Sequence, residues 1–220
     1  SAGTILMAGD GNPAIQMNDN GRLSNAGLIT SLASFSPVVV ARDGNTLINT
    51  GTVSALGSGS VAILTRDNNT IRNSGTINLA TDAFSGIQVD GSNNTVVNNG
   101  LITGGGFFTA GILASTGGTG NVITNNGTIS MGQGAIGMDI DDDGAVVTNN
   151  GTITVGDGGF AVDFCGCVTG FTFNNNGLLR APGTGFAFNS GGAGVMNVNN
   201  NGTMDGSVFA DGVLFNNRGK

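Results

Sequence analysis

The motif Asn-x-Gly occurs once in each of nine successive repeats of this 220-residue chain, and a hydrophobic residue stands four positions before each of these nine glycines. The first three of these glycines, Gly27, Gly51 and Gly75, are 24 residues apart, and later intervals stay between 24 and 27 until a last one of 17. A period of this length is typical of solenoids, in which each repeat stacks on the next. The repeat therefore predicts one elongated domain over residues 1–220.

Each period contains three short apolar segments. The middle segment alternates, as at Ile63/Thr65 and Ile87/Val89, and the third segment stands four residues before the glycine, as at Ile71. Such alternation, bounded by Gly, Asn and Asp, predicts β-strands. Glu is absent and Lys occurs once, so two good helix formers are nearly missing. The first segment places one apolar residue two positions after each glycine: Ile5, Ile29, Val53, Ile77, Ile102, Ile129, Ile153, Leu179 and Met204.

Three strands in about 24–25 residues make one coil of a parallel β-helix. Left-handed β-helices use shorter hexapeptide periods, so we predict an all-β, right-handed parallel β-helix of about nine coils. Successive coils lie ~4.8 Å apart, which gives a rod roughly 40–45 Å long. We expect six of these residues to stack in one interior column: Ile29, Val53, Ile77, Ile102, Ile129 and Ile153.

The asparagine of the motif is expected to point inward at a corner, because it shares the strand alternation of the apolar residue two positions before it. Equivalent amides one coil apart can then hydrogen-bond along the rod as a ladder. We expect the following glycine to supply a turn residue with positive φ. The predicted ladder consists of Asn25, Asn49, Asn73, Asn98, Asn125, Asn149, Asn175, Asn200 and Asn217.

The composition argues against several classes of function. The net charge is −7 and there is no basic stripe, so nucleic acid is not an expected partner. The chain has no apolar run of 18 residues, so this segment is not expected to insert into a membrane. It lacks His, Tyr and Trp, which excludes a His-based triad and the usual aromatic sugar platforms. We therefore predict no catalytic residues, and a carbohydrate-active β-helix enzyme remains a minor alternative.

The acidic residues gather at one place. Aligning the coils puts Asp163 over Asp139, with Asp141 on the same outward side. Stacked carboxylates repel each other unless a cation lies between them, so Asp139, Asp141 and Asp163 are candidate ligands of a weak Ca²⁺ site. The alternative is a solvated acidic patch, and no other cofactor is expected. Elsewhere, Arg66 and Asp90 fall in equivalent positions, which predicts exposed ion pairing of little energetic weight.

The two cysteines stand two residues apart, at Cys165 and Cys167. Extended residues at this spacing face the same side at the limit of disulfide reach, and the glycine between them lets the chain tighten. In an exported protein we expect a local disulfide, which closes too small a loop to add much stability. A free reactive pair and an intermolecular link are the alternatives.

The phrases Ile-Thr-Asn-Asn-Gly-Thr-Ile (residues 123–129) and Val-Thr-Asn-Asn-Gly-Thr-Ile (147–153) resemble the repeats of bacterial autotransporter passenger domains. The resemblance covers essentially the whole chain. It implies a right-handed β-helix at the outer-membrane surface of a Gram-negative bacterium or secreted from it, often acting as an adhesin or autoaggregation factor.

Two non-enzymatic functions follow as hypotheses. The first is a structural and adhesive surface or matrix module that contacts a host cell, a neighbouring cell or another copy side by side. The second is an extracellular filament subunit that assembles end to end, because both chain ends interrupt a coil and open sheet edges invite pairing. An excised piece of a longer passenger would show the same interrupted ends.

Overall fold

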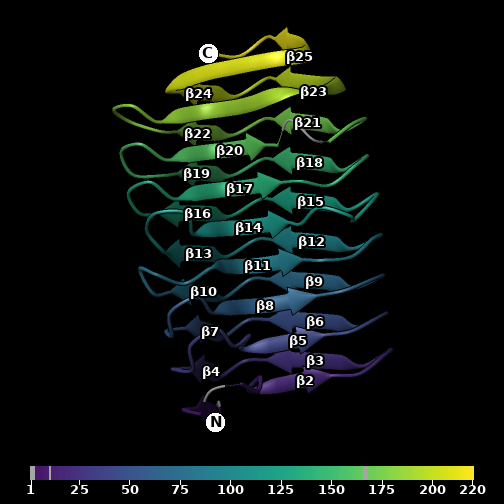
Figure 1. The fold of residues 1–220 in the computed structure, drawn as a ribbon, viewed down its shortest axis with the longest axis vertical. Helices are drawn as coiled ribbons and strands as arrows, with labels where there is room; N and C mark the ends of the chain where they lie inside the picture. Colours follow the sequence, from purple (N-terminus) through teal and green to yellow (C-terminus); the bar gives the residue numbers. More distant parts are fainter. Residues whose placement is uncertain (1–2, 10, 166–167) are drawn as a thin grey trace.

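The computed structural model describes residues 3–9, 11–165 and 168–220, and within them it contains 25 β-strands and no helix. The strands wind into a rod in which each coil lies directly on the one before (Figure 1). This confirms the predicted parallel β-helix. The rod has about 8 turns, close to the predicted nine.

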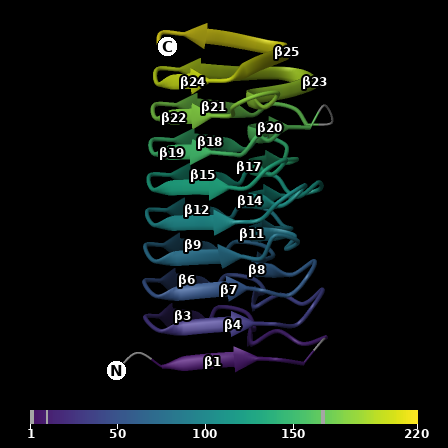
Figure 2. The ribbon, with the colours of Figure 1, turned by 90° about the vertical axis from the view of Figure 1, so that its left-hand side faces the viewer.

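Three faces surround the interior of the rod, and all strand pairs between neighbouring coils are parallel. The first face is a nine-stranded sheet that begins at the N-terminal end (Figure 2). Its strands are β1 (Thr4–Met7), β4 (Leu28–Ser31), β7 (Thr52–Ala55), β10 (Thr76–Leu79), β13 (Leu101–Gly104), β16 (Thr128–Met131), β19 (Thr152–Thr154), β22 (Leu178–Arg180) and β24 (Thr203–Asp205).

The second face follows the first in every coil, after a loop that we call the first corner. Its last two strands are longer than the others and continue through the next corner into the third face. They are β23 (Phe186–Asn200) and β25 (Ser207–Asn217). The other strands of the second face are β2 (Ile15–Met17), β5 (Val39–Ala41), β8 (Val61–Thr65), β11 (Ser85–Val89), β14 (Ala110–Ala114), β17 (Ile136–Ile140) and β20 (Phe160–Phe164).

The third face carries the strands that end in the asparagine of the repeat motif. The second corner separates it from the second face, and the Asn-x-Gly turn forms the third corner, which leads back to the first face. Its strands are β3 (Arg22–Asn25), β6 (Thr46–Asn49), β9 (Thr70–Asn73), β12 (Thr95–Asn98), β15 (Val122–Asn125), β18 (Val146–Asn149) and β21 (Thr172–Asn175).

The core is a set of columns that run the length of the rod. On the first face, Ile77 pairs in register with Val53 on one side and Ile102 on the other. All three side chains are buried, and so are Ile29, Ile129 and Ile153, which confirms the predicted interior column. Near the C-terminal end the core becomes aromatic, and the rings of Phe164 and Phe171 stack with centroids 3.7 Å apart.

The glycine of the motif is required for a different reason from the one predicted. None of these glycines has a positive φ. Instead, the third corners of successive coils approach so closely that a Cβ at Gly100 would collide with the carbonyl oxygen of Gly75, and the other coils repeat this contact. The expectation of a left-handed turn residue was therefore wrong, and the glycine serves the close stacking of backbones.

Candidate functional site

The predicted asparagines form one column inside the third corner. Each Nδ2 donates a hydrogen bond to the Oδ1 of the asparagine in the next coil, at 2.7 to 2.9 Å, from Asn25 through to Asn217. The side chains from Asn25 to Asn200 are buried, and Asn217 at the end of the column is exposed. We call this column the inner ladder.

The inner ladder also holds the backbone of the third corner. The Asn25 Oδ1 accepts from the Gly27 amide at 3.0 Å, and its Nδ2 lies 3.2 Å from the Gly27 carbonyl oxygen and 3.1 Å from that of Thr52. Partly buried backbone groups of the corner thus find partners. The asparagines of the inner ladder therefore connect neighbouring coils and hold the corner backbone. The size of their contribution to the free energy of unfolding remains a prediction.

A second asparagine column, which the sequence reasoning missed, lies at the second corner. The Oδ1 atoms of Asn69, Asn94 and Asn121 each accept the backbone amide of the equivalent residue in the preceding coil, at 2.7 to 2.8 Å. Asn45 does the same for the Gly21 amide at 2.7 Å. The signal was present, because each of these asparagines stands six residues before a motif glycine.

A third column, also missed, is exposed on the outside of the third corner. It begins at Asn99, and each later Nδ2 donates to the Oδ1 of the asparagine in the coil before, at 2.8 to 3.0 Å. We call it the outer ladder. Its members directly follow the inner asparagines in sequence: Asn99, Asn126, Asn150, Asn176 and Asn201.

The candidate cation ligands lie on the outer side of the second face. Asp139 pairs in register with Asp163, and both are half-buried, as is Asp141. Burial, together with the neighbouring charges of Asp141 and Asp163, raises the pKa of Asp139 to about 7. Burial also raises the pKa of Asp163, although the Asn189 Nδ2 donates to its carboxylate at 2.6 Å and opposes the shift. The patch is therefore electrostatically unfavourable when all three carboxylates are ionised.

Asp142 differs from its neighbours because its side chain points into the second corner and is fully buried. Its Oδ2 accepts the Asn121 amide at 3.2 Å, so it extends the second asparagine column by one coil. Its Oδ1 has no hydrogen-bond partner among the residues that the structure describes. Burial raises the pKa of this carboxyl, and the bonds from Asn121 oppose the rise.

Within residues 3–9, 11–165 and 168–220, no three His, Cys, Asp or Glu side chains are grouped so as to hold a metal ion. The weak Ca²⁺ site at Asp139, Asp141 and Asp163 thus remains a prediction without a preformed ligand set. Cys165 follows β20 and is partly exposed. Cys167 lies outside the described residues, so the predicted disulfide also remains a prediction.

A column of charged residues runs along the edge of the second face, at the start of the second corner. Arg42 and Arg66 are exposed there and line a shallow hollow that also contains the carboxylates of Asp19 and Asp43. The expected pairing of Arg66 with Asp90 was wrong, because Asp90 accepts instead from Gln88 and Ser115, at 2.7 and 2.8 Å. In the described part of the chain the only ion pair joins Arg180 and Asp205.

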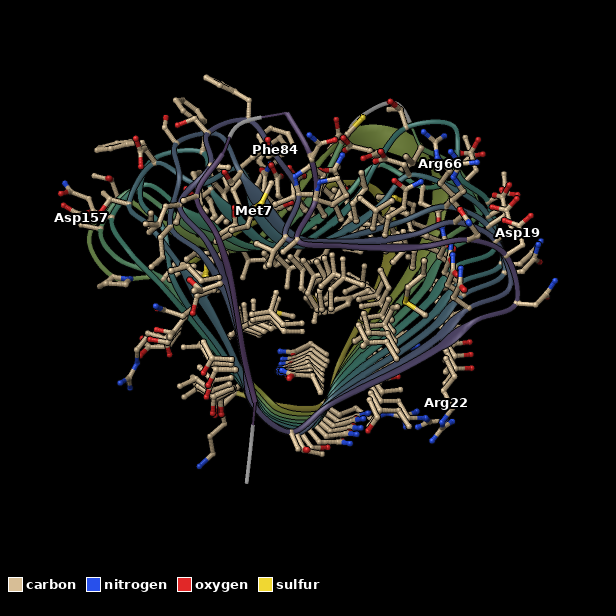
Figure 3. All side chains as sticks on the ribbon, turned by 90° about the horizontal axis from the view of Figure 1, so that it is seen from below. Met7, Asp19, Arg22, Arg66, Phe84 and Asp157 are labelled. Atoms are coloured by element: carbon tan, nitrogen blue, oxygen red, sulfur yellow. The ribbon has the colours of Figure 1, made fainter. Side chains whose placement is uncertain are left out.

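The first corner carries an exposed row of large apolar side chains. Phe35 and Phe108 are 81% and 82% exposed, and both adopt left-handed backbone conformations, with φ of 52° and 60°. A bulky residue in this conformation is strained by roughly 1 kcal/mol or more. Figure 3 places Phe84, of the same row, on the outside of the rod. We call this row the apolar ridge: Leu32, Phe35, Leu56, Phe84, Phe107 and Phe108.

Comparison with known proteins gives one family. The family model described as the BigA third pectate lyase-like domain matches residues 1–163 of the chain. No curated protein matches the chain, and no solved structure does. In the part of the chain that the structure describes, no helix has the length and apolar character needed to cross a membrane.

Proposed function

Because the chain belongs to the family of the BigA third pectate lyase-like domain, we propose that it is a non-enzymatic adhesive module of a bacterial surface protein. BigA is an autotransporter-type adhesin. In this proposal the chain acts outside the cell, at the outer-membrane surface of a Gram-negative bacterium or in its matrix. It provides a stiff rod whose faces bind a host cell, a neighbouring cell or another copy.

The apolar ridge is the observation that carries the proposal. Six large apolar side chains stand exposed along one corner, and two of them are held in a strained backbone conformation. An exposed apolar row on a monomer commonly marks an interaction site, and strain of this kind concentrates where a side chain is used. A regular stack of coils keeps the row straight, so it presents a contact line rather than a pocket.

Adhesion can be measured with beads coated with the purified chain. We expect coated beads to bind one another or bacterial and epithelial cells, and the double variant Phe35→Ser/Phe108→Ser to lose most of this binding. The control is Val122→Ser, which removes an exposed apolar side chain from the third face. Coated beads that bind nothing, or that bind equally well with the Phe35→Ser/Phe108→Ser chain, would contradict the proposal.

Two alternatives have their own tests. A carbohydrate-active enzyme would use the carboxylates of the second face, and cleavage in a screen of acidic and neutral polysaccharides would favour it. An end-to-end filament would continue the columns of β1 into those of β25. Electron microscopy of the concentrated chain distinguishes it from an adhesive rod, because only the filament grows along the rod axis.

A further inference from the structure

The outer side of the second face is divided in charge along the rod. Its edge column passes through equivalent positions that follow β5, β8, β11, β14 and β17. The residues there are Arg42, Arg66, Asp90, Ser115 and Asp141. The adjacent column on the strands includes Asp139 of β17 and Asp163 of β20 and continues to Asn189 of β23. The two arginines therefore occupy N-terminal coils of this face, Asp90 follows them at β11, and Asp139, Asp141 and Asp163 lie in the coils beyond the middle.

Among the described residues, neither charged region is closed off by ion pairs, although Asp19 and Asp43 line the hollow beside Arg42 and Arg66. Arg42 and Arg66 form no ion pair among the described residues. Asp139 is half-buried beside two other carboxylates, and all three are desolvated enough to raise their pKa values. An opposite charge brought close to such a group relieves both the repulsion and the poor solvation. Both regions thus keep charged groups that form no ion pair in the described chain and that a partner can approach.

A two-fold axis placed across the rod between β11 and β14 makes this face complementary to itself. The rotation sets β8 of one copy against β17 of the other, and β5 against β20. Arg66 then faces Asp141, and Arg42 faces the coil of Asp163. Because the contact is isologous, each ion pair occurs twice.

We propose that two copies of this chain pair side by side and antiparallel through the outer side of the second face, with Arg42 and Arg66 of each copy against Asp139, Asp141 and Asp163 of the other. The inference deepens the proposed adhesive function by naming one partner of the surface, a second copy of the chain. A parallel pair does not give this match, because it sets the Arg edge of one copy against the first corner of the other.

Apolar residues at the centre fit the same symmetry. Phe84 immediately precedes β11. Phe107 and Phe108 lie just before β14 and are separated from it by Thr109. The axis between β11 and β14 therefore brings Phe84 of one copy to the Phe107 and Phe108 of the other. Figure 3 places Phe84 and Arg66 on the same side of the rod, whereas Arg22 lies on another.

The size of the face is sufficient for a reversible dimer. Five-residue strands are about 17 Å long, and eight coils about 4.8 Å apart span about 34 Å, which gives roughly 600 Å² per copy. Stable interfaces bury roughly 800 Å² per partner, and weak ones bury less. The apolar ridge beside the face adds the remaining area.

Charge reversal tests the pairing in solution. We expect the unmodified chain to dimerise in sedimentation at about 0.02 M salt and to dissociate at about 0.5 M salt, where exposed charges are screened. Arg66→Asp alone and Asp141→Arg alone should each weaken dimerisation at least tenfold. An equimolar mixture of the two variants should dimerise again, because the two substituted side chains then face each other with opposite charges, and the native Arg66 and Asp141 face each other at the symmetry-related contact.

The matched control is Arg22→Asp, which changes the net charge by the same amount as Arg66→Asp on a different side of the rod and should leave dimerisation unchanged. The proposal fails if the unmodified chain is monomeric at low salt, if it forms filaments instead, or if the mixture is no better than either variant alone. A monomeric chain whose beads still bind cells overturns this pairing and leaves the adhesive function standing. A chain that dimerises in solution but whose coated beads bind nothing supports the pairing and contradicts the adhesive function.

Discussion

At the scale of the residue, asparagine has three separate roles in this chain. In the inner ladder, its amide joins one coil to the next and also bonds the corner backbone. In the second corner, its oxygen accepts backbone amides. In the outer ladder, the same amide chain is exposed to water. Since a buried amide without a partner is costly and an exposed one is not, the three roles differ in energy although the residue is the same.

Neighbouring residues provide a direct comparison of the inner and outer ladders. Asn125→Ala removes a buried amide and leaves Asn98 and Asn149 each without one ladder partner, so we expect it to lower the free energy of unfolding by about 1–3 kcal/mol. Asn126→Ala removes an exposed amide and should change it by less than about 0.5 kcal/mol. Denaturant titration of both variants checks this, and equal midpoints would count against the buried ladder.

Asp139 should make the protein more stable in mild acid than at neutral pH. Its folded pKa of about 7 is raised above the ordinary value of 3.8, so its protonation favours the folded state. That contribution is complete below about pH 4 and is lost as the pH rises through about 7. We therefore expect Asp139→Asn to raise the free energy of unfolding at pH 8, by on the order of 1 kcal/mol, and to flatten its pH dependence.

Unfolding by denaturant at pH 5 and pH 8 provides the measurement for Asp139→Asn. The control is Asp82→Asn, which makes the same change on an exposed corner residue. An Asp139→Asn variant that is no more stable than the unmodified chain at pH 8, or a gain of the same size from Asp82→Asn, would be inconsistent with a desolvated carboxyl at position 139.

At the scale of the element, the corners determine how closely the coils can stack. The third corner allows only glycine, because the backbone of the preceding coil occupies the place of a Cβ. The second corner has a left-handed residue instead, which is Asn20, Asn68 or Asn93 in some coils and glycine, such as Gly144, in others. Asparagine tolerates this conformation better than most residues, so the two corners select glycine for different physical reasons.

Two substitutions separate the two reasons. Gly100→Ala places a Cβ against the Gly75 carbonyl, and we expect a loss of about 3 kcal/mol or more in the free energy of unfolding. Gly144→Asn introduces a side chain into open space at φ 68° and should be close to neutral. Thermal unfolding of both variants is the measurement, and a harmless Gly100→Ala would show that the coils can move apart.

The sequence predicted the parts of the fold that depend on periodicity. The repeat placed Ile77 and Asn73 inside because strand alternation fixes the side on which a residue lies. It did not reveal why Gly100 is needed, because a close backbone approach leaves no signal beyond the glycine itself. It also paired Arg66 with Asp90, because alignment of the coils shows which positions are equivalent. Alignment does not show which donor a carboxylate accepts from, and Asp90 accepts from Gln88 and Ser115 instead.

At the scale of the whole molecule, the rod is a one-dimensional stack. Strands contact their equivalents in adjacent coils, as β11 contacts β8 and β14, and no central body holds distant coils of the described chain together. Stability in such a stack is close to a sum of coil terms and neighbour terms. The division of charge along the second face exists only at this scale, because no single coil contains both Arg66 and Asp141.

This one-dimensional organisation predicts a gradient in local stability along the 220-residue chain. An interior coil is held from both sides and opens only if both interfaces break, whereas the first and last coils lose a single interface. We therefore expect native-state hydrogen exchange to be slowest in β11, β14 and β17 and to become faster toward β1 and β25. The measurement is made at high salt, where the proposed side-by-side pairing is dissociated, so that a partner does not protect the second face.

Equal protection in every coil would mean that the rod unfolds as one cooperative unit, and the additive description would then be wrong. A gradient would mean that the middle of the rod, where the two-fold axis passes between β11 and β14, is also its most rigid part.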